Sequence, residues 1–245
     1  MKTLCIDFGN TRIKWAVFQN DQPLGKVFDC EYDIEKFSKK ISNASFDKTI
    51  YASVKKDSEI MPFLKKINTS SESKSIKDLQ KFNFTSDYDL SQIGQDRMAV
   101  IAAGVEAYPN RPLLLIDAGT CITYDFVNEK NHHLGGMISP GITMRAKSFP
   151  AFTSNLPDIS GKIGDLTYSF PAKNTFQALW LGSVYSAVLE ATKMTDEFFR
   201  QYPDGICVIS GGDSKYFENH LKNAIFAPAN FLLKGIYALF KLNEF

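Results

Sequence analysis

The first residues with the chemistry to bind a charged ligand surround a tight turn predicted close to the N-terminus. An apolar run ends in the carboxylate of Asp7, and the small polar segment 9–11 follows before a second, alternating run. A carboxylate at the end of a buried strand can hold a hydrated cation, and the backbone N–H groups of such a turn can cradle a phosphate. Lys14, seven residues after Asp7, could reach the same phosphate. The alternative is an ordinary β-hairpin whose turn residues form local hydrogen bonds.

The same pattern recurs around Asp117, 110 residues after Asp7. The apolar run 113–116 leads into an Asp-x-Gly-Thr turn at 117–120, and an alternating run continues to residue 127. Two such hairpins indicate two similar half-molecules, with a phosphate-cradling turn on either side of a cleft. This arrangement is similar to the actin-like ATPase superfamily, which includes actin, sugar kinases and acetate kinase.

The composition is that of an ordinary globular protein with nearly balanced charge. The 245 residues carry 28 Lys and Arg against 27 Asp and Glu, a net charge of +1. This length allows two compact domains, and the charge offers no general surface for nucleic acid or membrane. The four cysteines and three histidines show no metal-ligand spacing. The absence of close cysteine pairs favours a reduced, cytoplasmic setting.

We expect neither a targeting segment nor a membrane span. The N-terminal apolar run is interrupted by Asp7, unlike a secretory signal, and no apolar stretch approaches the length of a transmembrane helix. The sequence also lacks the glycine-rich phosphate loop and the dinucleotide-binding fingerprint. Nucleotide binding would therefore depend on the Asp-x-Gly turns.

Segments typical of strands and helices alternate along the chain, which predicts an α/β fold with mixed sheets and flanking helices. The first elements expected after the opening hairpin are a strand at 26–30, a helix at 34–41, a strand at 49–54 and a helix at 58–67. The Pro-Asn-Arg-Pro segment 109–112 is typical of a hinge. It predicts two similar actin-like (ribonuclease H-like) domains, an N-terminal domain of residues 1–111 and a C-terminal domain of residues 112–245.

A second cluster of charged residues begins a predicted helix in the middle of the chain. The Gly-Gln-Asp-Arg sequence 94–97 precedes a helix predicted over 98–105. Asp96 lies in the first turn, where the helix dipole and the neighbouring Arg97 favour a carboxylate. An ordinary N-terminal acid is the alternative. The helix is apolar nearly all round, which predicts burial at a domain or subunit contact.

Four further segments carry notable features. The adjacent histidines 132–133 are predicted to point to opposite sides of a strand or turn, as surface residues rather than a metal pair. The Gly- and Pro-rich run 135–142 allows close backbone approach to a ligand. Thr175 is predicted to cap a long apolar helix at 176–194, and the strand 207–210 ends in a Gly-Gly pair before another helix.

Taken in order, these motifs resemble those of type III pantothenate kinase, and the resemblance covers the whole chain. The matching segments are Asp7-Phe8-Gly9-Asn10-Thr11, Gly94-Gln95-Asp96-Arg97, Asp117-Ala118-Gly119-Thr120, the Gly-Gly-x-Ile-x-Pro-Gly run 135–141 and Ser210-Gly211-Gly212-Asp213. A Gly-x-Asp-Arg motif between two Asp-x-Gly turns is specific for this family. The resemblance implies ATP-dependent phosphorylation of pantothenate to 4'-phosphopantothenate, the first step of coenzyme A biosynthesis.

The resemblance also implies a nucleotide site. The residues implied to bind the ATP phosphates are Asp7, Phe8, Gly9, Asn10, Thr11, Arg12, Ile13 and Lys14. Within this segment Asp7 would hold Mg²⁺ through water, and Lys14 would offset the phosphate charge. Thr120 would contact ATP from the opposite hairpin, and Asp117 would hold a monovalent cation, K⁺ or NH₄⁺.

A substrate site is implied in the same way. The residues implied to bind pantothenate are Tyr88, Gly94, Gln95, Asp96, Arg97 and Thr175. Asp96 would also accept the proton of the attacking hydroxyl, the role of a general base in phosphoryl transfer. The proline that usually accompanies the tyrosine element in this family is absent from the segment 88–93, so the pattern there departs from that of the family.

Members of this family are homodimers in which the partner subunit completes the substrate pocket, so we expect a homodimer here. The helices predicted at 98–105 and from residue 176 are the candidates for that contact. Neither nucleic acid nor a membrane is expected as a partner. Cys121 stands where the family commonly has a small residue, which would place a thiol near the nucleotide.

Two other functions remain compatible with parts of the pattern. One is a non-catalytic, nucleotide-binding regulator of the same fold, similar to a transcription activator. Loss of Asp7, Lys14 or Asp96 would favour it, and the sequence retains all three. The other is a small kinase acting on a different hydroxylated acid or sugar, which a panel of substrates would distinguish.

Overall fold

The computed structural model describes residues 1–42, 44–67, 72–165 and 169–243, and these form two compact units. Unit 1 comprises Met1–Arg111, Val127–Gly135 and Pro228–Phe245, and unit 2 comprises Pro112–Phe126 and Gly136–Ala227. The first boundary coincides with the predicted hinge. The prediction places all of residues 112–245 in the C-terminal domain. The segment Pro228–Phe245 belongs instead to unit 1, because its helix packs on the first sheet and on a helix of unit 1.

The first sheet is built around the N-terminal hairpin. Its strands are β1 (Thr3–Phe8), β2 (Arg12–Gln19), β3 (Gln22–Pro23), β4 (Phe28–Glu31), β5 (Lys48–Ser53) and β6 (Ser73–Ser75). The order is β3-β2-β1-β5-β6, and β4 also pairs with β2. Because β1 runs antiparallel to β2 and parallel to β5, which is itself parallel to β6, the sheet is mixed, as predicted.

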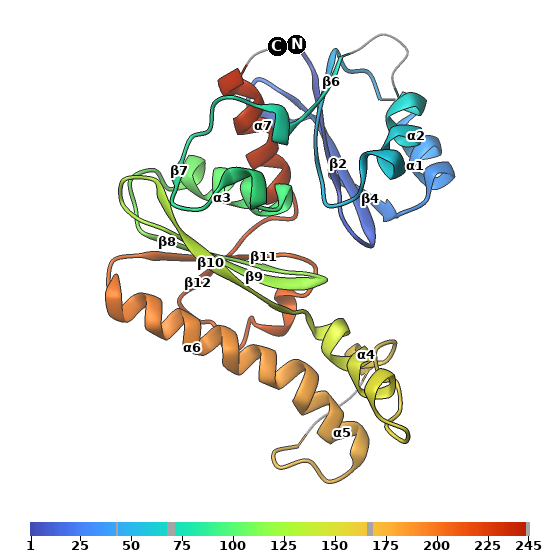
Figure 1. Ribbon diagram of the computed structural model, residues 1–245, viewed down its shortest axis with the longest axis vertical. Coiled ribbons are helices and arrows are strands. Elements are labelled where there is room, and N and C mark those ends of the chain that lie inside the picture. The colour runs from blue at the N-terminus through green and yellow to red at the C-terminus, as the bar shows by residue number, and fades with distance from the viewer. Residues whose placement is uncertain (43, 68–71, 166–168, 244–245) are drawn as a thin grey trace. The chain divides into compact units, whose positions relative to one another are not determined.

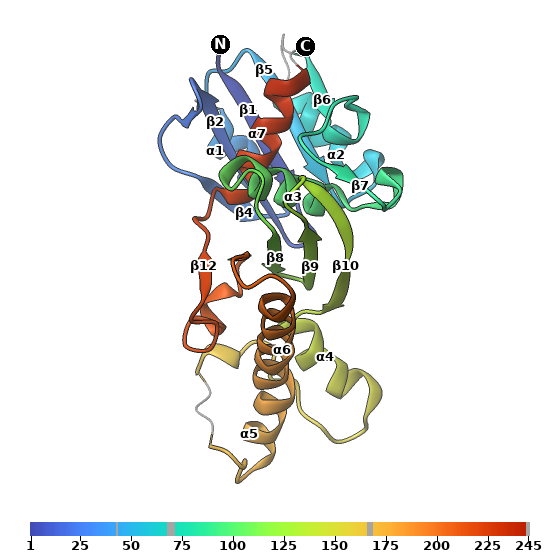
Figure 2. The ribbon, with the colours of Figure 1, turned by 90° about the vertical axis from the view of Figure 1, so that its left-hand side faces the viewer.

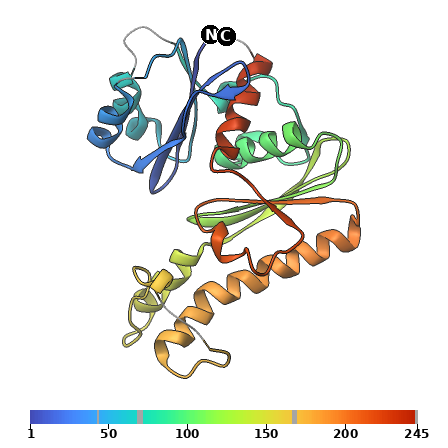
Figure 3. The same ribbon diagram turned by 180° about the vertical axis from the view of Figure 1, so that it is seen from behind.

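Helices cover both faces of this sheet (Figure 1). The helices of unit 1 are α1 (Ile34–Ile41), α2 (Asp57–Ile67), α3 (Gln95–Ala107) and α7 (Phe231–Asn243), with the short turns η1 (Ile76–Asp78) and η2 (Leu90–Gln92) and the strand β7 (Thr85–Ser86). Figure 3 shows α1 and α2, in blue and cyan, on one face of the blue strands and α7, in red, on the other. Side chains from both faces of β2 are therefore enclosed.

Aromatic side chains fill the core on the α1 and α2 face. The Trp15 ring packs edge-on against Phe37 at 5.0 Å between centroids, and Phe8 packs against Phe63 at 5.8 Å. On the opposite face, Phe18 stacks on Tyr237 of α7 at 4.8 Å. Such pairs add stability beyond the area that they bury.

Helix α3 is buried within its own unit by α7 (Figure 1). Its residues from Arg97 to Val105 are all buried, as the apolar sequence predicts. A Cβ atom at Gly235 of α7 would overlap the carbonyl oxygen of Ala99 and lie 2.9 Å from the nitrogen of Ala103. The predicted burial of α3 is therefore met by α7 within unit 1, and a subunit contact at α3 stays a prediction.

Unit 2 is organised around a second sheet. Its strands are β8 (Leu113–Ala118), β9 (Cys121–Val127), β10 (His132–Pro140), β11 (Ile206–Ser210) and β12 (Ala224–Phe226), and its helices are α4 (Ile142–Phe152), α5 (Thr175–Trp180) and α6 (Ser186–Gln201), with the short turns η3 (Ile163–Asp165) and η5 (Ser214–Tyr216). The strand order is β12-β11-β8-β9-β10-β7. Strand β7 and the first residues of β10 are counted with unit 1.

A π-helical turn, η4 (Leu181–Tyr185), joins α5 to α6, so the long helix predicted from residue 176 is a continuous helical run with a change of winding. Figure 2 shows this run with α4 beside it. Gly182 permits the contact with α4, because a Cβ atom there would lie 3.2 Å from the Phe149 ring. Hydrophobic residues of α6, including Val188 and Ala191, pack into the core of the second sheet.

The two sheets share one plan. Each has a central strand, β1 or β8, joined by a tight turn to its neighbour, β2 or β9. On its other side each central strand pairs in parallel with a later strand, β5 or β11, which in turn pairs in parallel with a short edge strand. The predicted fold class, α/β with mixed sheets and flanking helices, is confirmed. Within the described part of the chain, no helix is both long enough and apolar enough to cross a membrane.

The close approach of α7 to α3 predicts a specific cost for enlarging Gly235. Gly235→Ala should lower the free energy of unfolding by about 1–3 kcal/mol, because the added methyl group forces the helices apart. Urea denaturation of the purified chain measures this difference. Gly161→Ala is the matched control, because nothing lies within 4 Å of a Cβ there. Equal stability of the two variants would contradict the packing described for α3 and α7.

Candidate functional site

The turn between β1 and β2 brings the predicted phosphate-binding residues together. Asp7, only 6 % exposed, pairs across the strands with Lys14, so their side chains project to the same face. The Gly9 N–H donates to the carbonyl of Arg12 at 3.0 Å. A Cβ atom at Gly9 would lie 3.0 Å from that carbonyl oxygen and 3.9 Å from Asp7 Oδ2. Glycine therefore keeps the turn backbone close to the Asp7 carboxylate.

The remaining residues of this segment divide into exposed and buried groups. Asn10 and Thr11 are exposed at the tip of the turn, whereas the side chains of Phe8 and Ile13 belong to the core. Arg12 Nε donates to Asp29 Oδ2 at 2.7 Å, and this hydrogen bond lowers the pKa of the Asp29 carboxyl. The guanidinium of Arg12 thus has a carboxylate partner within the protein, and its contact with ATP stays a prediction.

Three sequence motifs converge on the turn between β8 and β9. Ser210 Oγ donates to Asp117 Oδ1 at 2.7 Å, and the Asp213 N–H donates to the carbonyl of Ala118 at 3.0 Å. From the other side, the Gly141 N–H donates to the carbonyl of Thr120 at 3.1 Å. The Gly-Gly-x-Ile-x-Pro-Gly and Ser-Gly-Gly-Asp motifs therefore both contact the Asp-x-Gly-Thr turn.

Glycines make this convergence possible. A Cβ atom at Gly141 would overlap the carbonyl oxygens of Gly119 and Thr120. Gly211 has a φ of 97°, and a Cβ atom there would overlap the backbone of Ala118. Any side chain at these two positions would push the neighbouring segments away from the turn.

A polar network supports the segment that carries Gly141. Glu190 of α6 accepts hydrogen bonds from Tyr124 Oη at 3.0 Å, Ser139 Oγ at 2.9 Å and Arg145 Nη2 at 2.6 Å. Arg145 Nε also donates to the carbonyl of Pro140 at 2.8 Å, next to Gly141. Burial, together with the charge of Glu190, raises the pKa of Tyr124. The end of β10 is thus fixed by an ion pair from two helices.

The Gly-x-Asp-Arg motif begins α3, as predicted. Asp96 Oδ1 accepts a hydrogen bond from the Arg97 N–H at 2.8 Å, so the carboxylate folds back over the start of the helix. A Cβ atom at Gly94 would lie 2.5 Å from the same oxygen. Gly94 therefore leaves room for the carboxylate of Asp96 in this position.

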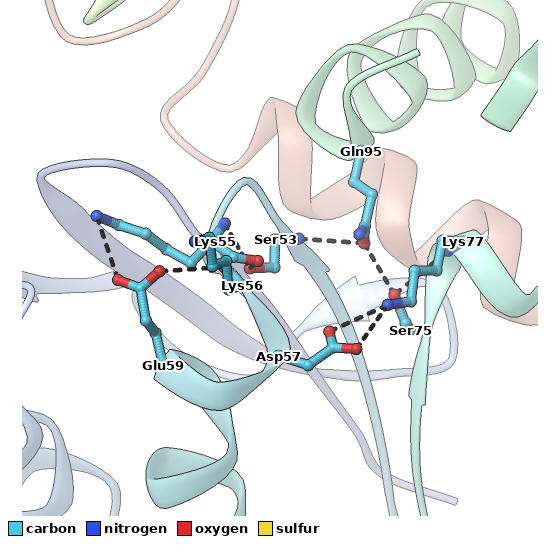
Figure 4. Close-up of polar contacts among 8 residues, drawn as sticks. All are labelled: Ser53, Lys55, Lys56, Asp57, Glu59, Ser75, Lys77 and Gln95. Carbon is cyan, nitrogen blue, oxygen red and sulfur yellow. Dashed lines mark hydrogen bonds and ion pairs between the residues drawn. The ribbon is translucent and has the colours of Figure 1, made fainter. Parts of the chain in front are cut away.

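Gln95 connects this helix start to the first sheet (Figure 4). Its Oε1 accepts hydrogen bonds from the backbone N–H of Ser53 at 3.1 Å and from Ser75 Oγ at 2.9 Å. A pocket of about 490 Å³ adjoins the start of α3, with Gly94 and Gln95 in its lining. The backbone predicted to hold substrate thus borders an open space.

Tyr88 lies beside Arg97 despite the missing proline. The guanidinium carbon of Arg97, a residue only 5 % exposed, lies 5.8 Å from the centroid of the Tyr88 ring. The Tyr88 N–H donates to Ser86 Oγ at 2.9 Å, and that oxygen lies 2.8 Å from His133 Nδ1. The structure therefore brings together these two predicted substrate contacts.

The prediction that both adjacent histidines lie at the surface is wrong for His133. This side chain is 0 % exposed, because the parallel pairing of β10 with β7 places it next to Ser86 and under Tyr88. His132 is partly buried, and its Nε2 lies 3.0 Å from Asp87 Oδ1. The described residues contain no group of three or more His, Cys, Asp and Glu side chains suited to a metal ion.

Thr175 occupies the first turn of α5 without capping it. Asn174 is the N-cap, and its Oδ1 accepts the Gln177 N–H at 3.0 Å. The prediction that Thr175 caps the helix is therefore wrong, because the preceding asparagine takes that role. Thr175 is itself exposed.

These segments are shared with a known enzyme family. The family model of type III pantothenate kinase matches residues 3–197. Proteins named type III pantothenate kinase from Christiangramia forsetii and Flavobacterium johnsoniae are 38 % and 36 % identical to the chain, over 98 % and 95 % of both sequences. The chain belongs to the type III pantothenate kinase family. Another protein of that name, from Bacteroides fragilis, is 31 % identical over 98 % of both sequences.

Solved structures place this family member among actin-like folds. A Campylobacter jejuni protein, described as a Baf family transcriptional activator, superposes with a TM-score of 0.63 at 21 % identity over 98 % of both chains. The activator of 2-hydroxyisocaproyl-CoA dehydratase from Clostridium difficile, solved with bound ADPNP, gives a TM-score of 0.54 at 13 % identity, over 100 % of this chain and 96 % of that one. At these identities the similarity shows the fold alone.

Sequence reasoning missed several polar residues that support the motifs of this kinase family member. These are Ser86 and His133 behind Tyr88, Ser75 behind Gln95, and Ser139, Arg145 and Glu190 behind Gly141. Each lies far along the chain from the residue that it supports or on a different element, so no local spacing marks it. The parallel pairing of β7 with the His-His segment could have been found only by locating β7, which is two residues long.

The network around Glu190 should be important for stability. Glu190→Ala would leave the guanidinium of Arg145, only 17 % exposed, without its carboxylate. Removing one partner of such a pair should lower the free energy of unfolding by about 3 kcal/mol. Glu197→Ala, on the same helix, is the control, because its pair with Arg200 is exposed and should contribute less than about 0.5 kcal/mol. Chemical denaturation would show similar losses for both variants if the Glu190 network were merely a surface feature.

Proposed function

We propose that this family member transfers the γ-phosphate of ATP to pantothenate and forms 4'-phosphopantothenate, the first step of coenzyme A biosynthesis. The observation that carries the proposal is the family match over residues 3–197, which includes the Gly-x-Asp-Arg motif at the start of α3. Phosphoryl transfer to a primary alcohol needs alignment, charge neutralisation and a proton acceptor. The described residues offer a candidate for each.

Asp96 is the proposed proton acceptor. Its carboxylate is held by the Arg97 N–H in the first turn of α3, where a helix favours negative charge. Gly94 keeps the space beside this carboxylate clear. A hydroxyl placed against Asp96 could therefore lose its proton as it attacks the γ-phosphate.

The turn between β1 and β2 is the proposed phosphate cradle. Its backbone N–H groups and Lys14 would neutralise phosphate charge, with the segment Asp7–Lys14 surrounding the phosphates. Mg²⁺ would offset phosphate charge there, and a single carboxylate acting through water is a usual protein contribution to such a site. Asp7, buried beside Gly9 and on the same face as Lys14, is the residue that would hold it.

The turn between β8 and β9 would complete the nucleotide contacts. Thr120 is the proposed ATP contact, and Asp117 the proposed ligand of a monovalent cation, K⁺ or NH₄⁺. The bound cation would reduce repulsion around the phosphates. Ser210 holds one oxygen of Asp117, which fixes the direction of its carboxylate. Oxygen donors of this kind suit a hard cation.

Pantothenate is proposed to bind at the start of α3. Arg97 and Tyr88 lie together there, and the backbone of Gly94 and Gln95 borders open space. Thr175 is the proposed further contact, and its exposure without a capping role leaves the hydroxyl accessible.

We also propose a homodimer that covers exposed apolar side chains of unit 2. The large apolar side chains exposed there include Ile138, Phe152, Phe170, Phe176 and Leu189, and Phe152 and Phe170 are 87 % and 78 % exposed. Large apolar side chains exposed on a protein surface mark contacts with other chains where they form a contiguous patch. Thr175, next to Phe176, would then lie close to the subunit interface.

A cytoplasmic location is proposed from the cysteines. Cys5 and Cys207 are completely buried thiols, and burial raises the pKa of both. Buried thiols of this kind are stable in a reducing compartment.

The reaction itself is tested by ADP release from the purified chain with ATP and Mg²⁺, with and without pantothenate. Release should depend on pantothenate, and Asp96→Asn should lower kcat by about 10²–10⁴-fold while leaving the thermal unfolding transition in place. Asp78→Asn, exposed in the same unit, is the matched control and should retain wild-type turnover.

Other outcomes of this assay would favour other functions. Nucleotide binding without turnover on any acceptor would favour a regulator. Turnover on a different hydroxylated acid or sugar, but not on pantothenate, would identify another kinase. Near-normal turnover by Asp96→Asn would remove Asp96 from the proposed role.

The cation proposal gives a separate prediction. ADP release should be faster in potassium than in sodium buffer, and Asp117→Asn should raise the K⁺ concentration for half-maximal rate at least about tenfold, because a neutral amide replaces a charged ligand. Asp158→Asn, exposed in unit 2, should leave the K⁺ dependence unchanged. An unaltered K⁺ dependence in Asp117→Asn would mean that the cation binds elsewhere.

A further inference from the structure

The start of α3 is anchored in an unusual way. Its N-cap is Gly94, which offers no side-chain hydrogen bond to the free N–H groups of the first turn. The next residue, Gln95, instead reaches out of the helix and bonds to the ends of two strands (Figure 4). The position of the helix start is therefore set by the sheet.

The directions of these hydrogen bonds follow from their chemistry. The backbone N–H of Ser53 can only donate, so the amide atom that faces it must be the oxygen, Oε1 of Gln95. The same oxygen faces Ser75 Oγ at 2.9 Å, so the Ser75 hydroxyl must donate as well. The Lys77 N–H donates to Ser75 Oγ at 3.4 Å, and the Ser75 side chain also forms a hydrogen bond with Tyr51.

The strand ends contacted by Gln95 lie at the edge of the sheet that carries the Asp7 turn. Ser53 is the last residue of β5 and pairs in register with Phe8, the last residue of β1. The next N–H, from Val54, donates to the Phe8 carbonyl at 3.2 Å. Because β1, β5 and β6 are parallel, Ser75 at the end of β6 lies at this edge too.

We propose that Gln95 and Ser75 form a clamp that fixes Asp96 relative to the phosphate cradle at Asp7. The clamp consists of Gln95 Oε1, the Ser75 hydroxyl and the Ser53 N–H, and all its members belong to unit 1. Ser75 is 1 % exposed, so water does not compete freely for its hydroxyl. Gln95 and Ser75 are positioning residues, and this role rests on the proposed function of Asp96 as the proton acceptor.

Such a clamp matters because phosphoryl transfer depends on the alignment of the base, the hydroxyl and the phosphate. A displacement of about 1 Å can lower turnover by about 10²-fold. Loss of the clamp would move Asp96 without removing any group that binds ATP. The effect should therefore appear in kcat, with the KM for ATP nearly unchanged.

The test compares two serine-to-alanine variants at neighbouring strand ends. Ser75→Ala removes the hydroxyl that bonds Gln95 and should lower kcat about tenfold. Ser53→Ala is the control, because the Ser53 hydroxyl bonds the backbone of Lys55, at 3.0 and 3.2 Å, and Gln95 is held by the Ser53 backbone N–H. It should retain kcat within about twofold. Ser75→Thr, which keeps the hydroxyl, should restore most of the lost turnover.

A double-variant cycle shows whether Ser75 acts through Gln95. Gln95→Met removes the shared acceptor and should lower kcat by up to about 10²-fold. In that background Ser75→Ala should have an additional effect of less than about twofold, because its partner is already gone. Independent effects of the two substitutions would overturn the clamp.

Hydrogen–deuterium exchange tests the clamp without any turnover. Exchange of the amides of Asp96, Arg97 and Met98 should be faster in Ser75→Ala than in the wild type, and unchanged in Ser53→Ala. If the wild type does not phosphorylate pantothenate, the proposed function fails while exchange still decides whether the clamp exists. Unchanged exchange in Ser75→Ala, or faster exchange with normal kcat, would overturn the positioning role.

Discussion

The parallel pairing of β1 with β5 is the constraint on which the arrangement of unit 1 depends. It places the end of β5 beside the end of β1, so the segment after Ser53 begins next to the Asp7 turn. The side chain of Gln95 accepts a hydrogen bond from this same edge of the sheet, and the contact fixes where α3 begins. Parallel strands have their carboxyl ends at one edge, so residues distant in sequence become neighbours there.

In the second sheet, strand register likewise brings together residues that are distant in the sequence. The register of β8 with β11 puts Asp117 directly beside Ser210, which accounts for the hydrogen bond between them. The glycines after Ser210 and before α4 then allow two more segments to approach the turn. Motifs that look separate in the sequence are thus joined by strand register and by the absence of side chains.

The sequence contains enough information for the local features and too little for the tertiary ones. The hairpins, the start of α3 and the fold class follow from apolar runs and turn residues that act over a few positions. The burial of His133 and the covering of α3 by α7 depend on partners far along the chain. The periodicity of apolar residues in the sequence does not reveal such partners. The cap of α5 was ambiguous for another reason, since Asn174 and Thr175 are adjacent and both residue types cap helices well.

The position of α7 has a consequence for how the chain folds during synthesis. This helix is made after all of unit 2, yet it covers α3 and one face of the first sheet. Until it emerges, the apolar surface between Ala99 and Val105 lacks its main cover. Unit 1 therefore cannot complete its core until unit 2 has been synthesised, although most of its residues are made first. The folding of unit 1 must wait for the synthesis of unit 2, which delays the slow, long-range packing of α7 on α3.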